Sequence, residues 1–164
     1  LTLLPVYCLQ QGFTAEIALA MVRTVVVGDA LLQLPIGALA DYLPRRTLFL
    51  VCAVLLLMSS LAIPLTLHTS LIWSIWVLFG ASAGGLFTLS LILIGERYRD
   101  DALVRANAHV AQLWGIGCLV GPLVAGAGSQ WISGHALPFL MAAGALGLVL
   151  LLLRQGAFGA AHPT

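Results

Sequence analysis

Two long stretches of the chain, residues 47–95 and 106–153, contain no formally charged residue. As a single α-helix, either stretch would be about 70 Å long, more than twice the ~30 Å hydrocarbon thickness of a bilayer. Each stretch therefore predicts two membrane-spanning helices joined by a turn. Turn-forming residues lie near the middle of both: Pro64 and segment 67–70 in the first, and a glycine- and serine-containing segment at 126–135 in the second.

Upstream, residues 17–40 form another apolar stretch, which follows a polar turn at 10–16. The mostly apolar residues before this turn number fewer than half of the roughly twenty that a spanning helix needs, so we interpret them as the end of a truncated helix. The pattern predicts an all-α, polytopic membrane bundle over residues 1–154, followed by a tail at 155–164. The six expected helices cover residues 1–9, 16–41, 46–67, 71–97, 103–131 and 137–154.

Composition supports a membrane protein. Of the 164 residues, 61% are hydrophobic and only 8% are charged, and the mean hydropathy is +1.07. Ordinary soluble domains are about one quarter charged. A net charge of +1 without a basic cluster excludes a nucleic-acid partner. The three cysteines are far apart in the sequence and form no disulfide or metal-ligand pattern, so we expect no metal and no cofactor.

The arginines are unevenly distributed along the chain. A hairpin returns the chain to the side of the bilayer on which it began, so the charged segments flanking the two uncharged stretches are expected on one side. Six of the seven arginines lie there: Arg45, Arg46, Arg97, Arg99, Arg105 and Arg154. The positive-inside bias makes this side cytoplasmic, and it places the C-terminal tail in the cytoplasm.

The junction of the second and third expected helices reads Gly-Ala-Leu-Ala-Asp-Tyr-Leu-Pro-Arg-Arg. It resembles the loop signature of the major facilitator superfamily, Gly-x-Leu-Ala-Asp-(Arg/Lys)-x-Gly-Arg-(Arg/Lys). The matching positions are Gly37, Leu39, Ala40, Asp41, Arg45 and Arg46, whereas Tyr42 and Pro44 depart from the signature. Such a turn can hold helix ends together through charge pairs and helix-dipole contacts, as a cytoplasmic gate brace. The alternative is a solvated loop whose arginines only set the orientation.

The resemblance extends over nearly the whole chain. The segment Gly95-Glu96-Arg97, and later Gly117-x-x-x-Gly121-Pro122-x-x-x-Gly126, look like parts of the tenth and eleventh helices of that superfamily. The resemblance thus implies helices seven to twelve of a twelve-helix secondary transporter, arranged as two inverted three-helix repeats with the first helix truncated. The closest resemblance is to an uncharacterised bacterial inner-membrane subgroup.

That resemblance also implies a function and its partners. We expect alternating-access transport of a small solute, driven by the proton gradient, with the lipid bilayer and a missing N-terminal half of the same protein as partners. A non-transporting polytopic assembly or scaffold protein is the alternative. An intramembrane enzyme would need paired catalytic groups at matched depth, and Asp29 has no second carboxylate at its depth, so we do not expect an enzyme.

Ionisable residues inside a span are costly and therefore suggest function. Asp29 lies near mid-membrane, and Gln33, four residues later, shares its helix face, so these two residues are candidates for proton coupling. A purely structural carboxylate is the alternative. Arg23 lies off that face, and it is a candidate to attract an anionic substrate or simply to pair or extend towards the membrane surface.

The fifth expected helix has a polar group near its cytoplasmic end. His109 and Gln112, three residues apart, are candidates for a proton relay, although one satisfied hydrogen bond is the plainer role for such a histidine. Further along, Trp114 belongs either to the core or to a cavity lining. Gly117, Gly121 and Pro122 then predict a bend in this helix or a close contact with another helix. Gly80 and Gly84 on the fourth expected helix have the same spacing of four, and they predict a close helix contact.

Overall fold

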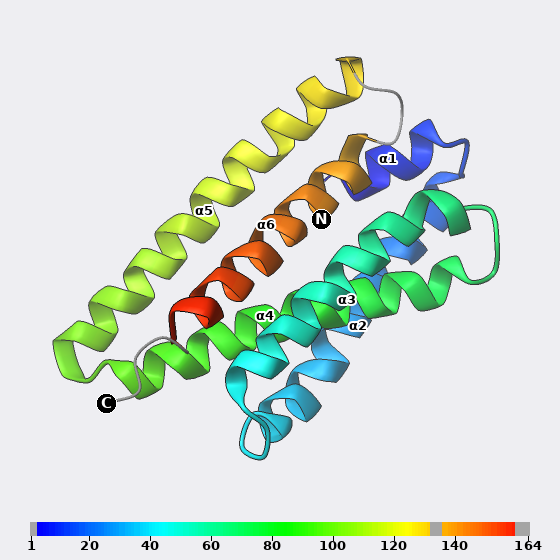
Figure 1. Cartoon of the computed structure of the whole chain (residues 1–164). Helices are drawn as coiled ribbons and strands as arrows, with labels where there is room; N and C mark the ends of the chain where they lie inside the picture. Colours follow the sequence, from blue (N-terminus) through cyan, green and yellow to red (C-terminus); the bar gives the residue numbers. More distant parts are fainter. Residues whose placement is uncertain (1–2, 132–135, 160–164) are drawn as a thin grey trace.

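The computed structural model describes residues 3–131 and 136–159, and these residues form a bundle of α-helices, as predicted. The helices are α1 (Leu4–Gln10), α2 (Ala15–Leu39), α3 (Arg45–Thr66), α4 (Ile72–Arg97), α5 (Asp100–Trp131) and α6 (Ala136–Gly159) (Figure 1). In the described part of the chain, four helical segments are long and apolar enough to span a membrane: Ala15–Leu39, Arg45–Thr66, Ile72–Arg97 and Leu137–Arg154. The chain is therefore a multi-pass membrane protein.

Most helix boundaries lie within three residues of the expected ones, and the largest difference is at the end of α6. Helix α5 begins at Asp100 rather than 103, and α6 continues past residue 154 to Gly159. The turn expected at 126–135 is described only as far as residue 131. Residues 132–135 of this turn and residues 160–164 of the expected tail lie outside the described residues.

Local chemistry explains how the helices begin and how they hold their polar side chains. Thr14 caps α2 by accepting a hydrogen bond from the Ile17 N–H at 3.5 Å, and Glu16 in the first turn complements the positive end of the helix dipole. Inside the helices, serine and threonine hydroxyls donate to carbonyls one turn earlier, as Ser60 does to Leu56 at 2.7 Å. These hydroxyls therefore need no water in an apolar environment.

Helices α2 and α4 cross in backbone contact. A Cβ atom added to Gly80 would overlap the carbonyl group of Val25, and one added to Gly28 would overlap the carbonyl group of Val77. Only glycine permits this approach, which confirms the close packing predicted for Gly80. Small residues at helix crossings are typical of membrane bundles, because tight van der Waals packing replaces the hydrophobic effect between spans.

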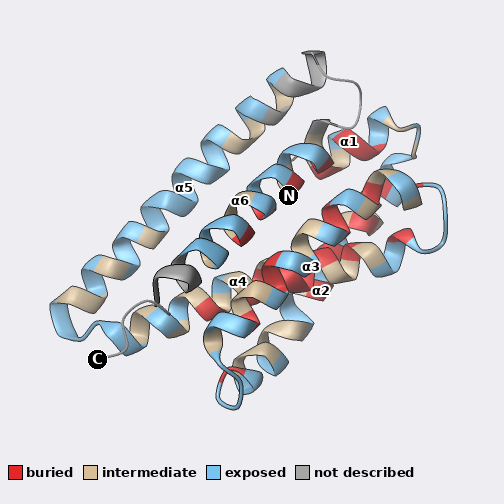
Figure 2. Ribbon diagram, viewed as in Figure 1, coloured by how far each residue is buried: buried red, intermediate tan, exposed pale blue. Residues whose placement is uncertain are grey.

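The core lies where α1, α2, α3 and α4 meet. Trp76 on α4 is only 1% exposed and packs edge-on against Phe79 at a ring-centroid distance of 6.0 Å. Figure 2 shows that buried residues concentrate in these helices and that α5 is mostly exposed. None of the described side chains on α5 is buried. Among the described residues, the main contacts of α5 are with α4 and α6, so it lies at the periphery of the bundle and leaves space on its inner side.

Candidate functional site

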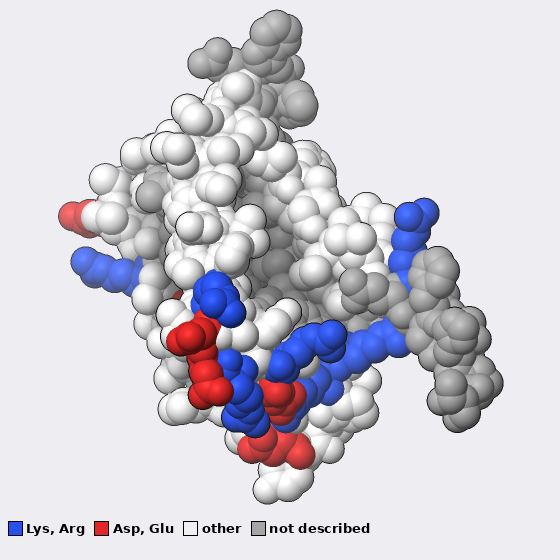
Figure 3. Space-filling view, turned by 90° about the vertical axis from the view of Figure 1, so that its left-hand side faces the viewer, with Lys and Arg blue, Asp and Glu red and all other residues white. Residues whose placement is uncertain are grey.

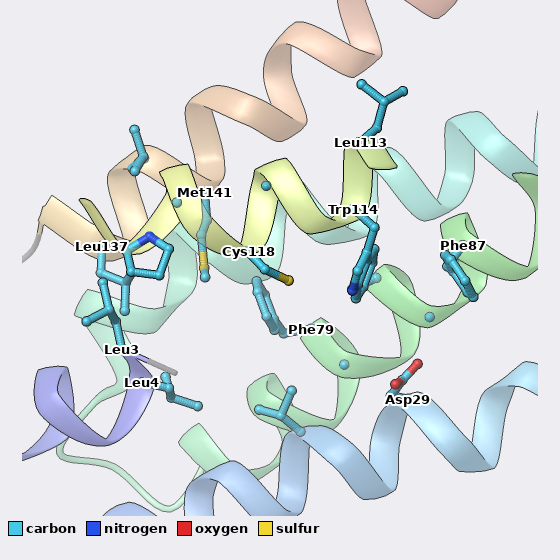
Figure 4. Close-up of a pocket in the computed structure, with 18 of the residues that line it drawn as sticks. Leu3, Leu4, Asp29, Phe79, Phe87, Leu113, Trp114, Cys118, Leu137 and Met141 are labelled. Atoms are coloured by element: carbon cyan, nitrogen blue, oxygen red, sulfur yellow. The ribbon is translucent and has the colours of Figure 1, made fainter. Parts of the chain in front are cut away.

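A cavity of about 960 Å³ lies between α2 and α4 on one side and α5 and α6 on the other, with the start of α1 at one end (Figure 4). It forms because α5 stands away from α4. Gly117 and Gly121 line it, and a Cβ atom at either position would meet no described atom within 4 Å. Pro122 also lines the cavity, within the continuous helix α5. Two glycines four residues apart therefore allow tight helix contact on α4, whereas the same spacing on α5 leaves an open cavity wall.

Asp29 provides the carboxylate of this cavity. It is half-buried on α2, and its Oδ1 accepts a hydrogen bond from Nε2 of Gln33 at 2.9 Å. A Cβ atom on Gly84 of α4 would overlap that same oxygen, so the carboxylate lies directly against the α4 backbone. Both Asp29 and Gln33 line the cavity, and Asp29 is the one formally charged residue among the described residues of its lining.

Aromatic rings face this carboxylate. Phe87 on α4 and Trp114 on α5 lie with ring centroids 5.2 Å apart and an angle of 55° between the rings. Figure 4 shows the Asp29 carboxylate pointing from α2 towards these two rings, with Phe79 further along the same wall. The structure thus assigns Trp114 to the cavity lining. Phe87 and Phe79 are absent from the sequence-based candidates, but they could have been found, because positions 79, 80, 83, 84 and 87 share one face of a helix.

The other candidates for transport chemistry lie outside the cavity lining. Arg23 is exposed on α2. His109 and Gln112 are exposed on α5, and Nδ1 of His109 lies 2.6 Å from the Arg105 carbonyl oxygen, one turn earlier. The residues that α5 turns towards the cavity near them are Val110, Leu113 and Trp114. The structure therefore brings Asp29 and Gln33 together and leaves the other three apart from them.

Charged side chains gather at one end of the bundle (Figure 3). Arg45, at the start of α3, forms an ion pair with Glu96 near the end of α4. Arg46 donates a hydrogen bond from Nη2 to the carbonyl oxygen of Leu152 on α6 at 2.9 Å. The arginine-bearing start of α3 therefore meets the ends of α4 and α6, as the hairpin argument predicts.

The remaining signature residues lie at the end of α2 and in the turn between α2 and α3. Asp41 is exposed, and Gly37 has open space where a side chain would be. Arg45 and Arg46 thus make the described polar contacts between helices, whereas Asp41 stays at the surface.

These features define a multi-pass membrane protein with a cavity between its helices and a charged cluster at one end. The chain matches the family model described as Major Facilitator Superfamily over residues 1–162. It belongs to this superfamily of membrane transporters.

Three relatives illustrate the similarity. The chain is 27% identical over 161 residues to an uncharacterised MFS-type transporter, YcaD, of Escherichia fergusonii, an alignment that covers 98% of this chain and 41% of the relative. It is 27% identical to an MFS-type transporter of Aspergillus terreus over 60% of this chain and 18% of the relative. It is 30% identical to the efflux pump dotC of Dothistroma septosporum over 56% of this chain and 16% of the relative. No solved structure matches the chain. The chain therefore spans less than half the length of these relatives.

Proposed function

We propose that this chain is the C-terminal half of a secondary active transporter that moves a small solute by alternating access, driven by the proton gradient. The observation that supports this most directly is the Asp29 carboxylate on the wall of a cavity between apolar helices. The match to relatives over only part of their length is consistent with a second half that forms the opposite wall. Rocking of the two halves would expose the cavity to each side of the membrane in turn.

Coupling to protons is proposed for Asp29 because of its surroundings. A carboxylate within a span is costly to retain unless it is paired or functional. Here its described hydrogen-bond partner is the neutral amide of Gln33, not a cation. A neutral partner leaves the negative charge uncompensated, so binding a proton or a substrate group would relieve an electrostatic cost. That property is what a coupling site requires.

The charged end is proposed as a brace on the cytoplasmic side of a bacterial inner membrane. Arg45 and Arg46 connect the start of α3 to α4 and α6. Contacts of this kind at partly exposed positions are weak, about 0.2–1 kcal/mol each, and can therefore break and reform as the halves rock. The six arginines that flank the two uncharged stretches of the sequence support the cytoplasmic assignment, which would also make the C-terminus cytoplasmic.

The test is proton-coupled flux by the complete gene product in proteoliposomes. Solutes of different chemical classes are added across a preset pH gradient, and those that dissipate it are identified with a pH-sensitive dye. We expect Asp29→Asn to abolish this dissipation for every active solute. The matched control is Glu16→Gln, which neutralises an exposed carboxylate at the start of the same helix, outside the cavity lining.

Two results would contradict the proposal. If no solute moves protons with the unmodified protein, proton-driven transport fails. If Asp29→Asn retains full coupled flux, then Asp29 is a structural carboxylate. Absence of any flux, coupled or uncoupled, would favour a non-transporting assembly or scaffold protein.

A further inference from the structure

We propose that the cavity binds a lipophilic organic cation, of the quaternary ammonium or phosphonium type. This inference names the substrate class of the proposed transporter, and it rests on the proposal that this cavity is the substrate site. Three properties of the described lining support it: the sign of its charge, its aromatic rings, and its size and apolar character.

The charge of the lining favours a cation over an anion. Asp29 is the one formally charged residue among the described residues that line the cavity. Arg23 projects from α2 at an exposed position that is not part of the lining, and Arg45 and Arg46 are bound at the far end of the bundle. In surroundings of low dielectric constant, an uncompensated carboxylate attracts a cation and repels an anion of the same shape.

The rings beside the carboxylate add a second preference for positive charge. Phe87 and Trp114 are tilted against each other at 5.2 Å between centroids, and Asp29 points towards them. A cation within about 6 Å of a ring centroid is attracted by the ring quadrupole, most strongly by tryptophan. The carboxylate and the two rings come from three helices, α2, α4 and α5, so a cation between them would contact all three.

The size and composition of the cavity specify the rest of the ligand. A volume of about 960 Å³ suits a multi-ring molecule. Apart from Asp29, Gln33 and Ser90, the described walls are mainly apolar, with side chains such as Leu113, Cys118 and Met141. A metal ion would need several oxygen ligands, whereas Asp29 supplies the one described carboxylate here. An organic cation whose charge is covered by apolar groups fits both requirements.

The experiment compares tetraphenylphosphonium with tetraphenylborate, which have nearly the same shape and opposite charge. Saturable binding to the complete gene product in nanodiscs is measured by equilibrium dialysis, with empty nanodiscs subtracted. We expect the phosphonium to bind at least tenfold more tightly than the borate. Asp29→Asn should reduce phosphonium affinity about tenfold or more and leave borate affinity unchanged or increased.

Three further variants separate the effects of charge, fold and aromatic ring on binding. Asp29→Glu keeps the charge and should keep most of the preference for the cation, whereas Glu16→Gln should leave both affinities unchanged. Phe87→Leu keeps an apolar side chain but removes a ring, and it should weaken phosphonium binding several-fold. Equal affinity for the two probes, or a preference for the cation that persists in Asp29→Asn, would overturn the inference.

The outcome is distinguishable from failure of the proposed function. If the phosphonium binds in an Asp29-dependent manner but no solute dissipates a pH gradient, the cation site stands and proton-driven transport fails. If Asp29-dependent flux occurs with other solutes while the two probes bind equally, transport stands and the cation inference fails.

Discussion

The Asp29 carboxylate of α2 occupies the space that a side chain at position 84 of α4 would fill. Gly84 is buried, and its missing side chain lets the carboxylate lie against the α4 backbone at the edge of the cavity. The hydrogen bond from Gln33 then holds one carboxylate oxygen in place. The position of the cavity's charge therefore depends on a glycine that belongs to a different helix.

The first prediction concerns this relationship. Gly84→Ala should force the Asp29 side chain to rotate, because the new methyl group would overlap Oδ1. We expect coupled flux to fall about tenfold or more, while the thermal stability in detergent falls by no more than about 1–3 kcal/mol, since a side-chain terminus can move aside. The matched control is Gly95→Ala on the same helix, where an added Cβ meets no described atom within 4 Å. Unchanged flux in Gly84→Ala would show that Asp29 needs no fixed position.

A second prediction separates the two glycines of α4. At Gly80 an added Cβ would overlap the Val25 carbonyl group, which is backbone and cannot rotate away. Gly80→Ala must therefore push α2 and α4 apart, and we expect a loss of stability at or above the upper end of the about 1–3 kcal/mol typical of overpacking. Thermal unfolding in detergent, followed by circular dichroism, should rank Gly80→Ala below Gly84→Ala. The opposite order would mean that the helix crossing tolerates separation.

The third prediction tests the charged brace. Reversing one charge, as in Glu96→Arg, places two cations together at the ends of α3 and α4, and it should lower the free energy of unfolding by about 0.2–1 kcal/mol, as for other partly exposed pairs. The double variant Arg45→Glu with Glu96→Arg should recover most of that loss. Chemical unfolding of the unmodified protein, of the single variants Arg45→Glu and Glu96→Arg, and of the double variant gives the coupling energy. Purely additive effects would show that the pair contributes nothing specific.

The fourth prediction uses the three cysteines. Cys8 and Cys52 are buried, with exposed fractions of 0% and 5%, whereas Cys118 is exposed and lines the cavity. N-ethylmaleimide should therefore label the folded protein at Cys118 well before the other two. Cys118→Ser should remove the early labelling, which mass spectrometry of the digested protein can locate. Early modification of Cys8 would contradict the packing of α1 against α2.

Much of this fold could be predicted because membrane insertion depends on local properties of the chain. A membrane span is recognised from the hydropathy of about twenty consecutive residues, and turn residues mark where a span ends. Four of the expected spans and the all-α class therefore follow from the order of residues alone. The meeting of the start of α3 with the ends of α4 and α6 also follows, because a hairpin returns the chain to the side of the bilayer on which it began. The pairing of Asp29 with Gln33 follows from their spacing of four.

Other features depend on contacts between helices that are distant in sequence. Gly80–Gly84 and Gly117–Gly121 have the same spacing, yet the first pair meets α2 closely and the second faces open space. The partners of Arg45 and Arg46, and the meeting of Asp29 with Phe87 and Trp114, likewise required the packed bundle. The sequence by itself determined the all-α class and the four described segments that are long and apolar enough to cross a bilayer. Only the tertiary structure decided which helix faces meet, because that choice depends on shape complementarity between surfaces that are almost equally apolar.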